Sequence, residues 1–169
     1  AVLDELRDLF MQAERPVIIA GRGVRLAGAQ AVLQALATEF NVPVVTPYLG
    51  IDNLRHDLDI YIGKTGVKGD RPANFTMQNA DLVIAVGTSL HISVIGYEYE
   101  QFARAAKKVV IDIDLTSHRK RTIQIDRMIE SDAKQALDGL LTRLHEANFK
   151  SVSAPWLQRC VGWKKKYPV

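Results

Sequence analysis

The cluster Gly21-Arg22-Gly23 could bring backbone amides close to a phosphate. It directly follows the apolar run 17–20, and glycine has no Cβ to hold a ligand away. Arg22 would add positive charge. The turn resembles a dinucleotide fingerprint, but Leu26 stands where the third glycine is expected, and no acidic residue ends the next apolar run. A tight strand-to-helix turn that binds nothing explains the cluster equally well.

A second glycine cluster occupies residues 63–69. Gly63, Gly66 and a third glycine recur at a spacing of three, with Thr65 between the first two. Backbone that lacks side chains can reach a ligand, and the two lysines, Lys64 and Lys68, favour an anionic one. The alternative is a surface loop whose lysines are simply solvated.

Two further groups of polar residues end apolar runs of the chain. They are Gly87, Thr88 and Ser89, after the run 81–86, and Asp112, Ile113 and Asp114, at the end of the run 108–114. Hydroxyl groups can bind a phosphate, and carboxylates can accept hydrogen bonds from ribose hydroxyls or an adenine amine. Both groups can instead cap the turns that follow them.

No pattern of residues indicates catalysis. His56, His91, His118 and His145 lie on different segments, and none has metal-ligand spacing to a second ligand. Cys160 lies on an apolar helical face, which favours a packed thiol over a reactive one. The residues by themselves predict a binding protein with no catalytic residue and no metal site.

The elements that would position these residues alternate between strands and helices. Short apolar runs bounded by glycine are typical of strands buried on both faces of a parallel sheet. The patterns predict strands at 17–20, 43–46, 81–86, 108–114 and 127–130, and helices at 3–13, 28–40, 72–79, 97–106 and 132–144. The stretch 47–70 is expected to be irregular. The prediction is an α/β fold with three layers and a doubly wound, five- or six-stranded parallel sheet. This Rossmann-like fold is of the DHS-like NAD/FAD-binding domain type.

The last residues differ in character from the rest. Residues 151–155 have the composition of a linker, and Trp156, Cys160 and Trp163 then recur at helical spacing. We therefore expect a nucleotide-binding-like domain over 1–150. Residues 151–169 would form a linker and the start of a helix toward a missing C-terminal domain.

Composition excludes several classes of protein. The 169 residues are 47% hydrophobic and 24% charged, which predicts a packed core. A net charge of +3 without a basic, aromatic stripe argues against nucleic acid as a partner. One cysteine rules out a disulfide framework, and no apolar run is long enough to predict a membrane span. By default a cytoplasmic location is expected.

The order of the motifs resembles the central domain of thiamine-diphosphate-dependent enzymes, in particular the large subunit of acetolactate synthase. The resemblance covers about residues 1–148. It rests on this series in order: G-R-G-V, P-V-V-T, G-K-T-G-V-K-G, N-A-D-L-V-I-A-V-G, V-V-I-D-I-D and S-D-A-K-Q-A-L.

The resemblance implies a fragment of a three-domain enzyme, a transferase or lyase acting on 2-oxo acids. Thiamine diphosphate and magnesium would be bound by the outer domains, whose glutamate and G-D-G…N signatures do not occur here. The fragment alone is therefore expected to be inactive. Its implied partners are the flanking domains of the same polypeptide and further copies in a homo-oligomer.

The family also implies that the central domain holds FAD, ADP or nothing. The matching positions are Gly21, Arg22, Gly23, Gly63, Thr65, Gly66, Gly87, Thr88, Ser89, Asp112, Ile113 and Asp114. The synthases continue their V-G with Arg-Phe-Asp-Asp-Arg, whereas this chain has Thr-Ser-Leu-His-Ile at 88–92. Their loop histidine is Lys68 here.

Two alternatives remain open from the sequence. The same sheet topology serves free-standing nucleotide-binding proteins, such as relatives of nicotinamide-dependent deacylases, although the cysteine quartet of their zinc module is missing. The domain could also be a structural spacer in which every glycine turn is empty.

Overall fold

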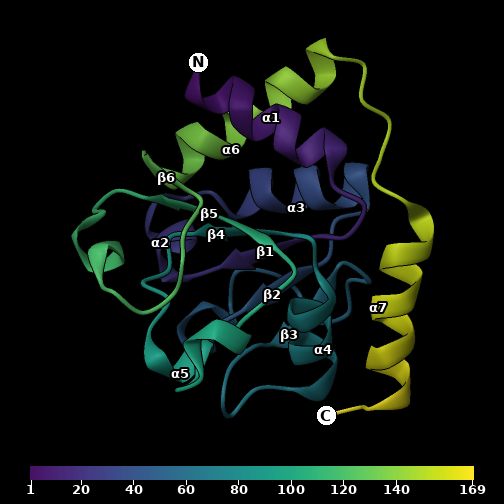
Figure 1. Cartoon of the computed structure of the whole chain (residues 1–169). Helices are drawn as coiled ribbons and strands as arrows, with labels where there is room; N and C mark the ends of the chain where they lie inside the picture. The colour runs from purple at the N-terminus through teal and green to yellow at the C-terminus, as the bar shows by residue number, and fades with distance from the viewer.

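Six strands pair into one parallel sheet with the order β3-β2-β1-β4-β5-β6 (Figure 1). The computed structural model describes all residues, 1–169. The strands are β1 (Pro16–Ala20), β2 (Val44–Thr46), β3 (Tyr61–Lys64), β4 (Leu82–Val86), β5 (Lys107–Asp112) and β6 (Arg127–Glu130). The α-helices are α1 (Val2–Gln12), α2 (Arg22–Leu26), α3 (Gln30–Phe40), α4 (Arg71–Asn79), α5 (Ile92–Ile95), α6 (Ala133–Glu146) and α7 (Ala154–Lys166). This strand order is that of the doubly wound Rossmann fold.

Helices cover both faces of the sheet, because its central strands are apolar on both sides. Ile18 and Ile84 point to the face on which α1, α3 and α6 pack. Val17 and Val83 point to the opposite face, which α4, α5 and α7 cover (Figure 1). Both β1 and β4 are buried along their whole length. The predicted three-layer α/β fold with a parallel sheet is confirmed.

The irregular stretch expected over 47–70 contains a strand that the sequence pattern did not predict. β3 pairs with β2, with Val44 opposite Tyr61 and Thr46 opposite Lys64. It is only four residues long and includes Gly63, whose φ is +141°. Such a short run with an interior glycine carries no clear strand pattern, so its pairing depends on the neighbouring strand.

The helix expected at 97–106 is wrong. The structure has a single 3-10 turn, Tyr99–Gln101, followed by irregular backbone. Ala103 adopts a φ of +43°, which an α-helix cannot accommodate, and its amide donates to Gln78 Oε1 at 2.9 Å. The periodicity marked the buried positions Phe102, Ala103 and Ala106, but not their backbone.

The helix expected to begin at Gly28 is preceded by a separate short helix. α2 begins immediately after β1, and Gly28, with a φ of +65°, turns the chain into α3. β5 ends at Asp112, so the last two residues of the predicted strand 108–114 lie in the following turn. Asp132 caps α6, because its carboxylate accepts from the Gln135 amide.

Helix α7 packs back on the sheet, against α4 and the edge strand β3 (Figure 1). Trp156 is buried, and its indole N–H donates to the Pro16 carbonyl at 2.8 Å. At the other end of the helix, Lys164 Nζ donates to the carbonyls of His56, Leu58 and Tyr61. The polar atoms of these side chains thus fix both ends of α7. None of the helices combines the length and apolar character that a membrane span requires.

Candidate functional site

The predicted site residues all lie at or just beyond the carboxyl ends of the parallel strands. β1 and β4 are adjacent although other elements separate them in the chain, so this point is the topological switch of the sheet. Ligands of open α/β sheets bind in the crevice outside the carboxyl ends of the strands at such a switch point. The geometry of each turn therefore decides what the carboxyl ends of these strands can bind.

The glycines that follow β1 and β4 pack against each other. The Gly23 amide donates to the Gly87 carbonyl at 2.9 Å, and the Gly21 amide donates to the Val86 carbonyl at 2.9 Å. A Cβ on Gly21 would lie 2.3 Å from the Gly87 carbonyl oxygen, and one on Gly23 would lie 2.7 Å from Gly87 Cα. The close backbone approach that we expected toward a ligand thus occurs between the two turns themselves.

The second glycine cluster is held by hydrogen bonds within the domain. The Gly66 amide donates to Asn74 Oδ1 and the Gly66 carbonyl accepts from Asn74 Nδ2, both at 2.9 Å. The Thr65 hydroxyl donates to the same Asn74 oxygen at 3.1 Å. A Cβ on Gly63 would lie 2.7 Å from a carboxylate oxygen of Asp70. Hydrogen bonds to Asn74 therefore hold the turn after β3 in place, in contrast to the solvated loop that the sequence also allowed.

A hollow of about 160 Å³ joins the ends of β1, β4 and β5. Gly23, Gly87, Asp112 and Ile113 line it, as does Leu26 at the end of α2. The side chains of Leu26 and Ile113 are 71% and 72% exposed, although both are large and aliphatic. The hollow thus has apolar side chains at its mouth, two aspartates, Asp112 and Asp132, in its wall and bare backbone beside them.

A buried histidine fixes the carboxylate of Asp112. His118 Nε2 donates to Asp112 Oδ2 at 2.9 Å, and the His118 side chain is buried. A carboxylate has about four lone-pair positions, so Asp112 can accept further hydrogen bonds from a ligand. Asp114 instead accepts from the Thr116 amide at 2.8 Å, and hydrogen bonds from the Thr116 side chain and amide lower the pKa of the exposed Asp114 carboxyl. Asp114 therefore caps its own turn.

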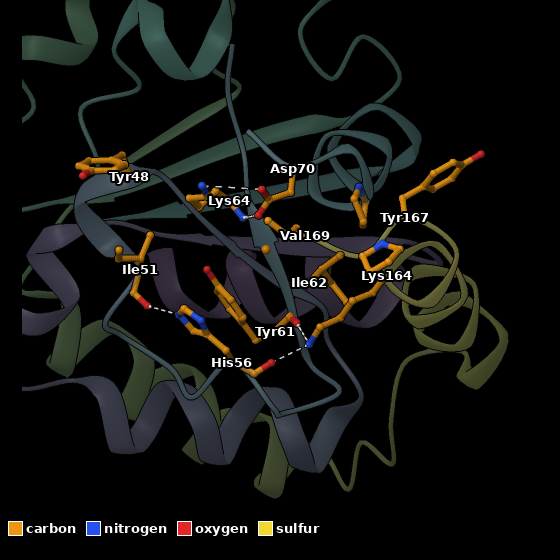
Figure 2. Close-up of a pocket in the computed structure, with 13 residues that line it drawn as sticks. Tyr48, Ile51, His56, Tyr61, Ile62, Lys64, Asp70, Lys164, Tyr167 and Val169 are labelled. Atoms are coloured by element: carbon orange, nitrogen blue, oxygen red, sulfur yellow. Dashed lines mark hydrogen bonds and ion pairs between the residues drawn. The ribbon is translucent and has the colours of Figure 1, made fainter. Parts of the chain in front are cut away.

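The remaining predicted residues are divided between other places. Gly21, Arg22, Thr88 and Ser89 lie outside the hollow. Thr65 lines a separate pocket of about 340 Å³. Gly66 belongs to a smaller depression beside α4, together with Thr65. Gly63 lines the largest pocket, of about 460 Å³, between the β3 edge and the end of α7 (Figure 2). One continuous slot through all twelve positions is not what the structure shows.

Three residues near the site were missed by the sequence reasoning. Leu26 and His118 carry no local signal, because their roles depend on neighbours distant in sequence. Asn53 is buried, and its Nδ2 donates to the carbonyls of Ala20 and Gly21 at 3.2 and 2.8 Å. It ties the stretch after β2 to the end of β1, while its own Oδ1 has no partner.

The fold is that of a doubly wound domain with a hollow at the switch point of its parallel sheet. Residues 3–140 match the family described as thiamine pyrophosphate enzyme, central domain. Because this match covers most of the chain, the chain belongs to that family, and the resemblance inferred from the ordered motifs is confirmed.

Its relatives include large subunits of acetolactate synthase. The protein from Cyanidium caldarium is 29% identical over 170 residues, which cover 99% of this chain and 29% of that protein. A probable large subunit from Methanocaldococcus jannaschii is 35% identical over 157 residues, covering 93% of this chain and 26% of that protein. The chain thus spans less than a third of the length of these curated relatives.

Proposed function

We propose that this chain works as the central domain of a thiamine-diphosphate-dependent enzyme of the acetolactate synthase kind, acting on 2-oxo acids. The family match over residues 3–140 carries this proposal. The catalytic groups, thiamine diphosphate and magnesium would reside in flanking domains. The central domain would hold those domains and neighbouring subunits in place.

Enzyme assays on two lengths of protein test this role. The complete reading frame, supplied with pyruvate, thiamine diphosphate and magnesium, is expected to form acetolactate, whereas residues 1–169 alone form none. A complete protein that consumes no 2-oxo acid would refute the proposed activity. Acetolactate formed by residues 1–169 alone would refute the division of labour between domains.

We further propose that the hollow at the switch point takes the adenosine end of a nucleotide, which ADP and FAD share. The exposure of Leu26 and Ile113 at its mouth supports this, because a planar, largely apolar adenine ring can pack against both. Ribose hydroxyls would donate to the Asp112 carboxylate, which His118 holds in place. The hollow of about 160 Å³ is smaller than the 300 Å³ or more of typical ligand pockets. The rest of the nucleotide would therefore lie outside it, near the exposed Arg22.

ADP and FAD differ in what lies beyond the diphosphate, so variants can separate them. A pocket of about 340 Å³ lies beside the turn after β3, and Tyr48 and Tyr97 line it. This pocket would receive the flavin ring of FAD. Ile113→Asp is expected to abolish calorimetric binding of both nucleotides. Tyr97→Ala is expected to weaken FAD while leaving ADP unchanged. Equal loss of both with Tyr97→Ala would contradict this placement of the flavin.

The end of the sheet at which the strands have their carboxyl ends also offers a surface for the proposed neighbouring domains or subunits. Four large apolar or aromatic side chains are exposed there, in the segments after β2, β3 and α5: Tyr48, Leu49, Val67 and Tyr97. Scattered apolar residues need no partner, but several at one edge favour an interface. Analytical ultracentrifugation of the complete protein tests the proposed homo-oligomer, which a monomeric mass would contradict.

A further inference from the structure

A pocket larger than the switch-point hollow lies beside the edge strand β3. It occupies about 460 Å³ between the turn after β2, the edge strand β3 and the end of α7 (Figure 2). This is within the range of roughly 300–1,000 Å³ for small-molecule sites. No residue of the nucleotide hollow lines it. It is therefore separate from that hollow, although it shares Tyr48 and Lys64 with the pocket of about 340 Å³.

The aromatic wall of this pocket is fixed before any ligand arrives. Tyr61 is 4% exposed, and its hydroxyl forms a hydrogen bond of 3.0 Å with Thr46 Oγ1. The His56 ring stacks on Tyr61 with a centroid separation of 5.1 Å and an angle of 16°. Tyr48 and Ile51 border the same space, as Figure 2 shows. Such a preformed wall of rings and aliphatic carbons favours a planar, apolar body.

The polar lining of the pocket favours a negative group on that body. Lys64 and Lys164 line it, and Asp70 is its one acidic side chain. Lys164 directs its ammonium at three backbone carbonyls, so its donors are already used. Lys64 Nζ lies 3.8 Å from Asp70 Oδ1, too far for a hydrogen bond. Its donors are free for a second carboxylate.

We propose that this pocket is a binding site for a small aromatic monocarboxylate. The ring of the ligand lies against the wall made by Tyr48, His56 and Tyr61, and its carboxylate accepts hydrogen bonds from Lys64. The site does not depend on adenosine binding, because it shares no residue with the switch-point hollow, whereas Tyr48 and Lys64 also line the pocket proposed for the flavin ring.

Titration of the ¹⁵N-labelled chain with 2-naphthoate, followed by NMR, tests the site directly. We expect saturable shifts of the amides of residues 61–64. The uncharged isostere 2-naphthamide is expected to bind about tenfold or more weakly, because it cannot form the charge-assisted hydrogen bond. Hexanoate, which has the charge without the ring, is also expected to bind more weakly. Equal affinity of naphthoate and naphthamide would overturn the role of Lys64.

Lysine variants identify the pocket and provide the matched control. Lys64→Met is expected to weaken naphthoate about tenfold, and Lys64→Gln gives a second test that keeps a polar group. Lys68→Met removes a lysine from the same turn that lines the neighbouring pocket and not this one, so affinity should be unchanged. Ile113→Asp should also leave it unchanged. Loss with Lys68→Met but not with Lys64→Met, or shifts absent from residues 61–64, would overturn the proposal.

Discussion

Replacing Gly87 by alanine tests whether the glycine turns exist for packing between strands. Gly87 has a φ of +59°, and a Cβ there would lie 2.7 Å from Gly23 Cα and 2.8 Å from Gly23 C. Real Cβ atoms essentially never approach backbone below 3.0 Å, so the turns after β1 and β4 must separate. Overpacking of this kind costs about 1–3 kcal/mol. Left-handed backbone adds about 1–2 kcal/mol for alanine. Alanine also makes the unfolded chain less flexible than glycine does, and this effect offsets about 0.4–1 kcal/mol of the destabilisation.

Gly28 provides the matched control for this substitution. Its φ of +65° is nearly the same, but a Cβ there would meet nothing within 4 Å. Gly28→Ala therefore bears only the backbone cost, about 0.5–1 kcal/mol after the unfolded-state gain. We expect urea unfolding to show Gly87→Ala less stable than Gly28→Ala by about 1–3 kcal/mol, a midpoint difference of about 0.5–1.5 M. Equal destabilisation of the two variants would refute the packing argument.

Three further predictions concern side chains buried around α7 and β3. Lys164→Met leaves three carbonyls without their donor and should lower the free energy of unfolding by about 1–3 kcal/mol, whereas the exposed Lys165→Met should change it by less than about 0.5 kcal/mol; equal urea midpoints would contradict this. Burial raises the pKa of Tyr61, so the folded chain keeps a proton that the unfolded chain loses above its ordinary value of 10.0. Stability should therefore fall as pH rises above that value, and Tyr61→Phe should remove one late-ionising tyrosine from the absorbance titration. Burial also raises the pKa of the Cys160 thiol to about 12, so Ellman's reagent should label it at pH 8 only after urea is added; rapid labelling of the folded chain would show that it is accessible.

Much of the fold could be predicted because its signals are local. The apolar runs at β1, β4 and β5 end at glycine or aspartate and are strands in the structure. β3 could not be found in this way, since pairing with β2 stabilises it despite an interior glycine. The expected helix at 97–106 failed for the opposite reason: Ala103 follows the helical burial pattern but has a left-handed backbone.

The candidate site shows the same division between local and distant information. The position of the site at the carboxyl ends of the strands follows from the parallel strand order, which right-handed crossovers make predictable. The hollow itself depends on Leu26, at the end of α2, lying near Ile113, in the turn after β5. The mutual packing of Gly21 and Gly23 with Gly87 was equally invisible, because a glycine in a sequence does not show whether a ligand or another backbone approaches it.

Calorimetric titration of ADP into the wild-type chain and the Ile113→Asp variant tests the central claim most directly, namely that the switch-point hollow receives the adenosine end of a nucleotide. We predict saturable heat with the wild-type chain and none with Ile113→Asp, while the unfolding midpoints of the two proteins agree, since Ile113 is 72% exposed. Absence of heat from ADP with the wild-type chain, or unchanged binding by Ile113→Asp, would contradict the account.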